Sequence, residues 1–141
     1  MPAIPTALKQ EVELRAHGCC EYCQSQNCFS PDPFSVEHII PTSKNGSSES
    51  DNLAFACQGC NNRKYNHTEA IDPLTGRITP LFHPRQQQWT EHFAWNENFT
   101  MVIGLTAIGR ATIERLKMNR KGVVNLRSVL HPIGKHPRSN L

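Results

Sequence analysis

Two Cys-x-x-Cys pairs constrain this chain more than any other feature of its sequence. Cys20 and Cys23 form the first pair, Cys57 and Cys60 form the second, and residues 24–56 separate them. Each pair can place two sulfur atoms on one ion, and the two pairs together complete the tetrahedral four-cysteine set of a structural zinc site. The intervening segment is long for a bare zinc ribbon, so we expect the zinc to hold the base of an inserted unit.

Other uses of these cysteines fit the sequence less well. A redox-active Cys57 would need the βαβ context of a thioredoxin-like fold, and it would not account for the second pair. Cys19 could exchange with Cys20 as a ligand, but Cys20 has the better spacing to Cys23. We expect Cys28 to be a small buried residue.

The composition indicates how large the core can be and in which cellular compartment the protein is expected. Hydrophobic residues make up 38% of the 141 residues and the mean hydropathy is −0.50, so a structural metal would supplement a modest core. No apolar run approaches the ~20 residues of a membrane span, and the first ten residues lack the apolar centre of a signal peptide. We therefore expect a cytoplasmic protein without a membrane partner, in which the six cysteines do not form disulfides.

Positive charge gathers at the C-terminal end of the chain. Residues 101–141 contain eight lysines and arginines against Glu114 alone, a net charge of +7, whereas residues 1–100 contain seven basic against eleven acidic residues, a net charge of −4. A basic segment beside an acidic remainder indicates a polyanionic partner. A solvated basic tail explains the charge distribution equally well.

The hydrophobic pattern predicts an α+β fold with a single domain over residues 1–130. Helices are expected at 6–17, 58–67, 106–118 and 122–130, and short strands at 33–41, 53–56 and 77–84. Segments 92–95 and 99–106 should form a hairpin in which Phe99, Met101, Ile103 and Leu105 share a face. The core motif would then span 20–67, the accessory hairpin and helices 77–130, and a basic, disordered tail 131–141.

Four polar residues lie between or beside the cysteine pairs. They are Glu37, His38, Asn52 and Asn61. These residue types bind hard metal ions, accept protons and orient neighbours through hydrogen bonds. Each also has an ordinary explanation, because single histidines on strands are commonly surface residues and Asn52 follows Asp51 in a turn.

The order of these residues resembles that of the HNH endonuclease family. The matching pieces are "CEYC" (20–23), "VEHIIP" (36–41), "SKNGSSESDNLAFAC" (43–57) and "CQGCNNRK" (57–64). The resemblance covers about a third of the chain. It implies a ββα-metal unit with a four-cysteine zinc at its base. Asn61 stands where many members have histidine, and some members carry asparagine there.

The resemblance also implies a reaction and a role for each residue. The family hydrolyses phosphodiester bonds in DNA to give 5′-phosphate and 3′-hydroxyl products, with His38 as the general base and Asn52 orienting it. Glu37 and Asn61 would hold Mg²⁺, or Mn²⁺, which stabilises the leaving 3′ oxygen. Their oxygen donors favour these ions over Zn²⁺ or Ni²⁺. Asn62 is the alternative ligand if the helix register differs.

Two basic residues of the same predicted helix are candidates for substrate contact. Arg63 and Lys64 could bind flanking phosphates, although a charged, solvated helix face is an equally good explanation. DNA is the expected partner, with RNA as an alternative, and the oligomeric state is open. A non-catalytic zinc module that binds nucleic acid is the competing function.

Overall fold

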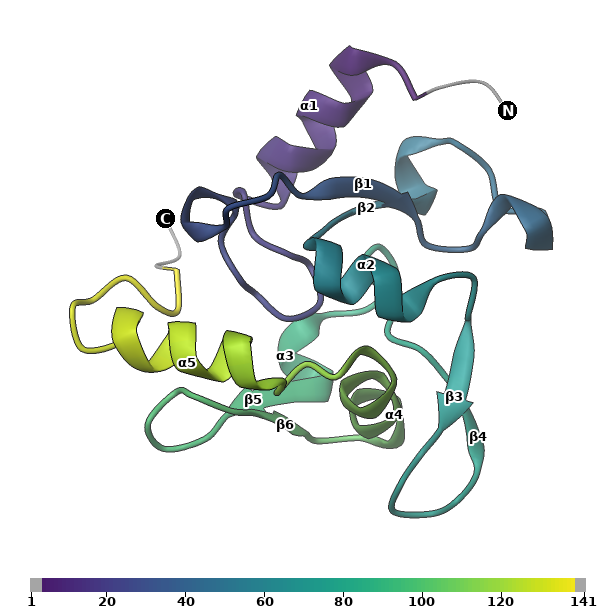
Figure 1. Cartoon of the computed structure of the whole chain (residues 1–141). Helices are drawn as coiled ribbons and strands as arrows, with labels where there is room; N and C mark the ends of the chain where they lie inside the picture. Colours follow the sequence, from purple (N-terminus) through teal and green to yellow (C-terminus); the bar gives the residue numbers. More distant parts are fainter. Residues whose placement is uncertain (1–3, 139–141) are drawn as a thin grey trace.

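The structure, a computed structural model, describes residues 4–138 and has an α+β fold (Figure 1). Within that range the helices are α1 (Thr6–Arg15), α2 (Gln58–Lys64), α3 (Trp89–His92), α4 (Ala107–Leu116) and α5 (Lys121–Leu130). The strands form antiparallel pairs, which are β1 (Ser35–His38) with β2 (Leu53–Ala56), β3 (Glu69–Ile71) with β4 (Ile78–Pro80), and β5 (Phe93–Trp95) with β6 (Val102–Gly104). No helix in the described part of the chain is long and apolar enough to cross a membrane.

The predicted helices are present, and the two faces of the β5–β6 hairpin differ in exposure. Thr106 caps α4 by accepting a hydrogen bond from the Gly109 N–H at 3.0 Å. In the C-terminal hairpin Met101 and Ile103 are exposed, whereas Val102 between them is buried. The side of Val102 therefore faces the core, because α4 packs against β6 there.

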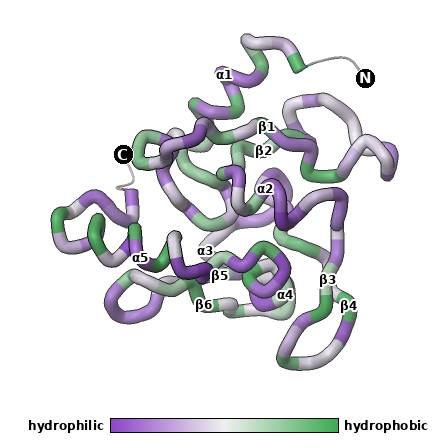
Figure 2. Tube along the Cα trace, viewed as in Figure 1, coloured by the Kyte–Doolittle hydropathy of each residue, from purple (hydrophilic) through white to green (hydrophobic). Residues whose placement is uncertain are grey.

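Strand β2 lies between two hydrophobic clusters. Leu53 and Phe55 pack in the smaller cluster with α1, and Ala54 and Ala56 belong to the larger core. Successive residues of a strand point to opposite faces, so a strand covered on both sides is apolar throughout. Figure 2 shows the β2 segment as hydrophobic along its length. The hairpin is therefore held rigidly from both faces.

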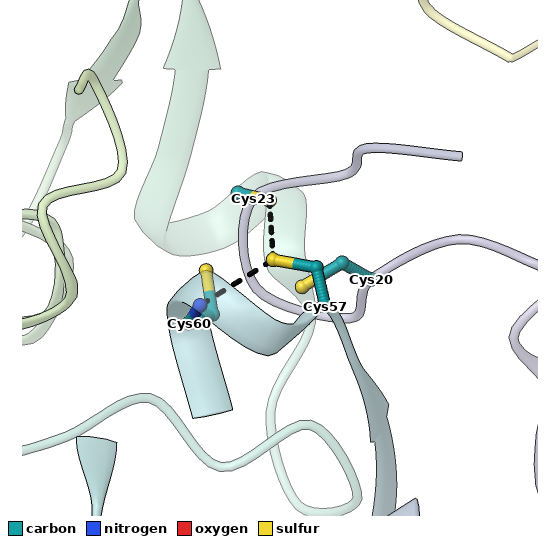
Figure 3. Close-up of side chains that lie close together, drawn as sticks. All are labelled: Cys20, Cys23, Cys57 and Cys60. Atoms are coloured by element: carbon teal, nitrogen blue, oxygen red, sulfur yellow. Dashed lines mark hydrogen bonds between the residues drawn. The ribbon is translucent and has the colours of Figure 1, made fainter. Parts of the chain in front are cut away.

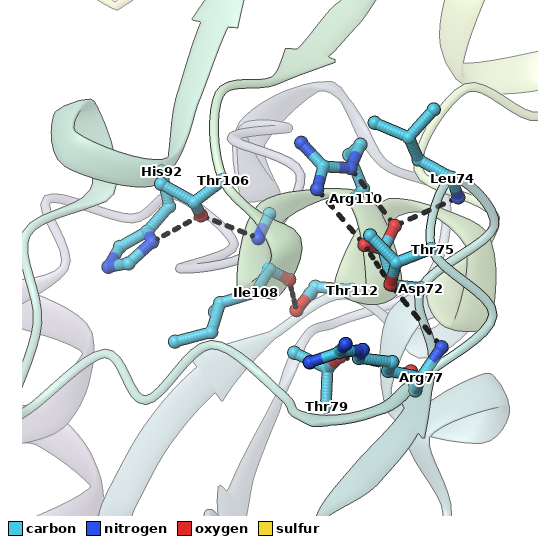
Figure 4. A network of polar contacts seen from close by, with 11 residues as sticks. Asp72, Leu74, Thr75, Arg77, Thr79, His92, Thr106, Ile108, Arg110 and Thr112 are labelled. Carbon is cyan, nitrogen blue, oxygen red and sulfur yellow. Dashed lines mark hydrogen bonds and ion pairs between the residues drawn. The ribbon is translucent and has the colours of Figure 1, made fainter.

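A buried ion pair attaches the β3–β4 hairpin to α4. Arg110 binds the Asp72 carboxylate through two hydrogen bonds, Nε to Oδ1 and Nη2 to Oδ2, each 3.0 Å long. The Leu74 N–H and the Thr75 hydroxyl donate to the same carboxylate (Figure 4). The hydrogen bonds from Arg110 are the main reason why the pKa of Asp72 lies well below its usual range.

Residues 131–138 do not form the disordered tail that the sequence predicts. The His136 ring is buried, its Nε2 lies 2.9 Å from the Phe99 carbonyl oxygen, and it packs edge-on against Trp95 with ring centroids 4.6 Å apart. His131 Nδ1 lies 2.8 Å from the His136 carbonyl oxygen. Aromatic and hydrogen-bonding contacts thus replace the aliphatic packing that this segment lacks. Residues 139–141 of the predicted tail lie outside the described residues.

Candidate functional site

The four predicted zinc ligands come together from three segments. Cys20 and Cys23 lie in the loop after α1, Cys57 follows β2, and Cys60 is on α2. All four are buried, and their sulfur atoms lie within 4.8 Å of one another (Figure 3). Within residues 4–138 no other group of three or more cysteine, histidine and acidic side chains is placed to hold an ion.

The geometry of this sulfur cluster fits structural zinc. A tetrahedral ion with Zn–S bonds of about 2.3 Å separates its sulfurs by about 3.8 Å, and the Cys23 and Cys57 sulfurs lie 3.6 Å apart. Cys57 is also the N-cap of α2, because its sulfur accepts a hydrogen bond from the Cys60 N–H at 3.4 Å. Four thiolates would supply a closed site in which the ion contributes folding energy and no open position for a reaction.

Arg120 supplies positive charge beside this cluster. Arg120 lies between α4 and α5 in the chain, and its guanidinium reaches the cluster, with Nη2 3.3 Å from the Cys57 sulfur and Nη1 3.7 Å from the Cys60 sulfur. A side chain at Gly59 would collide with this guanidinium, because a Cβ there would lie 2.3 Å from Arg120 Nη2. Arg120 thus compensates the negative charge of the thiolates and ties the accessory helices to the cysteine cluster.

His38 and Asn52 lie at the other end of the β1–β2 hairpin. The Asn52 side chain accepts from the Ile40 N–H at 2.9 Å and donates to the carbonyls of Ile40 at 2.9 Å and Ser47 at 2.7 Å. It therefore closes the loop that follows His38. That loop carries Ser48, whose Oγ lies 2.9 Å from His38 Nε2. The half-buried imidazole is positioned by the same loop that Asn52 holds.

Glu37 has a different environment from His38. Because neighbouring residues of a strand point to opposite faces, Glu37 points away from the His38 side and toward α2. Its side chain is 7% exposed, its Oε1 accepts from the Tyr22 hydroxyl at 2.5 Å, and its Oε2 accepts from Lys64 Nζ at 3.2 Å. Burial raises the pKa of Glu37, although the Lys64 charge and the hydrogen bond from Tyr22 oppose the shift.

This arrangement does not fit a Mg²⁺ ion at Glu37. An ammonium group already occupies the cation position, because Lys64 Nζ also donates to the carbonyls of Ile39 at 2.8 Å and His38 at 3.4 Å. The expected ligand pair of Glu37 and Asn61 is therefore not assembled as an open metal site. Within the part of the chain that the structure describes, the Asn61 side chain makes no hydrogen bond.

Comparison with known proteins bears on this geometry. The family model for HNH endonucleases matches residues 20–67. These residues form an HNH domain. No curated protein and no solved structure gives a significant match. The match covers the cysteine cluster, the hairpin and α2, which are the parts that the sequence predicted for this family.

The two basic residues on α2 of the HNH domain differ in exposure. Arg63 is exposed, and its Nη1 donates to the Gly59 carbonyl at 3.2 Å. Lys64 is only 2% exposed and holds α2 to β1, so it is not available for phosphate contact in this arrangement. Its helical position one turn after Cys60, whose side chain faces the core, explains why this lysine turns inward.

Several residues that contact the predicted site residues were not among those predicted from the sequence. Tyr22 stands between two cysteines and gave a local signal, because residues inside a Cys-x-x-Cys loop lie near the metal. Ser48, Arg120 and Trp89 gave none, since their contacts depend on how distant segments pack. Trp89 Nε1, for example, donates to the Tyr22 carbonyl at 2.8 Å.

Proposed function

We propose that this protein is an endonuclease that hydrolyses phosphodiester bonds in DNA, with His38 as the general base. The observation that carries the proposal is the coupling of His38, Ser48 and Asn52 inside a domain of the HNH family. If Nε2–H donates to the Ser48 hydroxyl, Nδ1 carries the lone pair that accepts a proton from the attacking water. Asn52 has no titratable proton, so its role is to keep the loop and the imidazole in place.

Mg²⁺ or Mn²⁺ would supply Lewis-acid stabilisation of the leaving 3′ oxygen in the chemistry that this family implies. Glu37 is paired with Lys64 and Tyr22, so its carboxylate is not free to hold that ion. Asn61 is the remaining predicted oxygen donor. The dependence on each ion is therefore measured as a separate arm of the experiment.

A plasmid-nicking assay tests the proposal. Supercoiled plasmid is incubated with the wild type, His38→Ala and the exposed control His17→Asn, with Mg²⁺ and with Mn²⁺. A general base contributes about 10²- to 10⁴-fold to the rate, so His38→Ala should lose nicking by about that factor while the control keeps it. Zinc content and far-UV circular dichroism should match in all three proteins. Equal nicking by the wild type and His38→Ala would remove the assignment to this residue.

The second candidate is a zinc-stabilised module that binds nucleic acid without cleaving it. The burial of the Glu37 carboxylate and its pairing with Lys64 favour this candidate, because a module that only binds nucleic acid needs no accessible metal ligand. It predicts that the wild type binds labelled DNA but nicks plasmid with neither ion. The same assay therefore separates the two functions.

A further inference from the structure

A groove with a volume of about 550 Å³ lies between the β3–β4 hairpin and the C-terminal end of α4. Figure 1 shows the hairpin extending beside α4. Two exposed isoleucines, the cross-strand partners Ile71 and Ile78, contribute an aliphatic wall. Arg115 and Lys117 line the groove from the side of α4. The groove therefore has one apolar and one charged wall.

The charged wall is mainly basic. Lys44, Arg115 and Lys117 supply three positive charges against the two carboxylates of Glu69 and Glu114, and His67, whose pKa is lowered, is neutral near pH 7. Glu114 is already paired, because its Oε1 lies 2.6 Å from Lys117 Nζ. Partial burial and the positive charges of Arg115, Lys44 and Lys64 lower the pKa of His67, which indicates a positive potential in this part of the groove.

The groove adjoins both segments that position His38. Lys44 lies in the loop between His38 and Ser48, which Asn52 closes. His67 follows α2 closely, and the Lys64 side chain at the end of that helix contacts the His38 carbonyl. Arg115 Nε also donates to the Arg63 carbonyl at 3.3 Å, so α4 and α2 meet at this edge of the groove.

We propose that this groove binds one strand of the DNA substrate next to the bond cleaved at His38. Phosphates would lie toward Lys44 and Arg115, and sugars and base edges toward Ile71 and Ile78. A nucleic-acid strand has a charged backbone and less polar bases, so a groove with one basic and one aliphatic wall matches it. The inference rests on the proposed function, because the strand is placed relative to His38.

Binding measured without cleavage tests the inference. In the His38→Ala background, fluorescence anisotropy with labelled single-stranded and duplex oligonucleotides compares Lys44→Gln and Arg115→Gln with Lys9→Gln on α1 and Lys121→Gln on α5. All four substitutions remove one positive charge from an exposed side chain. Losing one phosphate contact should raise Kd about fivefold at 0.15 M salt. For duplex DNA, it should also make the slope of the logarithm of the association constant against the logarithm of the salt concentration less steep by about 0.9. The controls should change Kd less than twofold.

The outcomes are distinct from those of the nicking assay. Equal Kd values for the groove and control variants, in proteins with equal melting temperatures, would overturn the inference even if His38→Ala abolishes nicking. If His38→Ala still nicks, the endonuclease assignment to His38 fails while a selective loss of binding in the groove variants still supports the groove. Light scattering compares the mass of the wild type with that of Ile78→Ser. If the wild type is a dimer, and Ile78→Ser is a monomer with unchanged DNA affinity, the groove is a self-association surface and the inference is overturned.

Discussion

The two ends of the β1–β2 hairpin are built on different principles. Near the pairing of Ser35 with Ala56, four sulfur atoms point at one another and fit a single ion. Near the pairing of His38 with Leu53, the side chains of Glu37, His38 and Asn52 each have a protein partner of their own. Cysteine sulfurs hydrogen-bond weakly, so few other groups compete for them, whereas carboxylates and amides find partners throughout a protein. Residue type and spacing therefore determine the first end far more completely than the second.

The largest effect is expected when a cysteine of the sulfur cluster is substituted. Cys23→Ser should leave the protein largely unfolded and without bound zinc, because a structural zinc site contributes folding energy directly. Circular dichroism and a colorimetric zinc assay after denaturation measure both quantities. Cys28→Ser is the matched control, since Cys28 lies outside the sulfur cluster and, against the expectation from the sequence, is exposed. A folded, zinc-free Cys23→Ser protein would contradict the prediction.

The next largest effect is expected at the buried ion pair between Glu37 and Lys64. Lys64→Met leaves the Glu37 carboxylate buried without its cation, and removing one partner of a buried pair costs about 3–5 kcal/mol. Urea unfolding monitored by fluorescence measures the loss. The double substitution Glu37→Gln with Lys64→Met should recover much of it, because neither remaining group carries an unpaired charge. If the single and double variants are equally unstable, lost packing rather than the unpaired charge is the cause.

A smaller effect is expected at the loop that follows His38. Asn52→Ala removes three partly buried hydrogen bonds and leaves the backbone N–H and carbonyl of Ile40 without their partner, which costs about 1–3 kcal/mol. Under the proposed function, its nicking rate should fall further than its stability explains, because the loop no longer positions Ser48. Rates measured well below the melting temperature separate the two contributions. Asn125→Ala, at an exposed position on α5, should change neither quantity.

The contrast between the two ends also marks what the sequence could predict. The cysteine spacing, the apolar run of β2 and the capping of α4 are local features, and each led to the correct element or cluster. The position of Lys64 one turn after Cys60 is a local feature, but its pairing with Glu37 depends on how α2 packs against β1, which no local pattern contains. The basic tail was misjudged for a related reason, since His136 is buried by Trp95 and Phe99 rather than by neighbours in sequence.

The smallest expected effects are in the pH dependence of stability, where the two buried carboxylates should behave oppositely. The pKa of Asp72 is lowered in the folded protein, so its contribution is present above the unfolded value of about 4 and is lost as the pH falls through the folded value. The pKa of Glu37 is raised, so its contribution is present below its unfolded value and is lost as the pH rises through the folded value.

The free energy of unfolding of the wild type, minus that of Asp72→Asn, should therefore rise with pH below about 4. The corresponding difference for Glu37→Gln should fall as the pH rises above about 4. Because all three proteins share the four cysteines, protonation of the thiolates cancels in each difference. Two curves with the same slope would show that Glu37, like Asp72, is held as a stabilised anion, and the hairpin would then carry a carboxylate already suited to binding a cation.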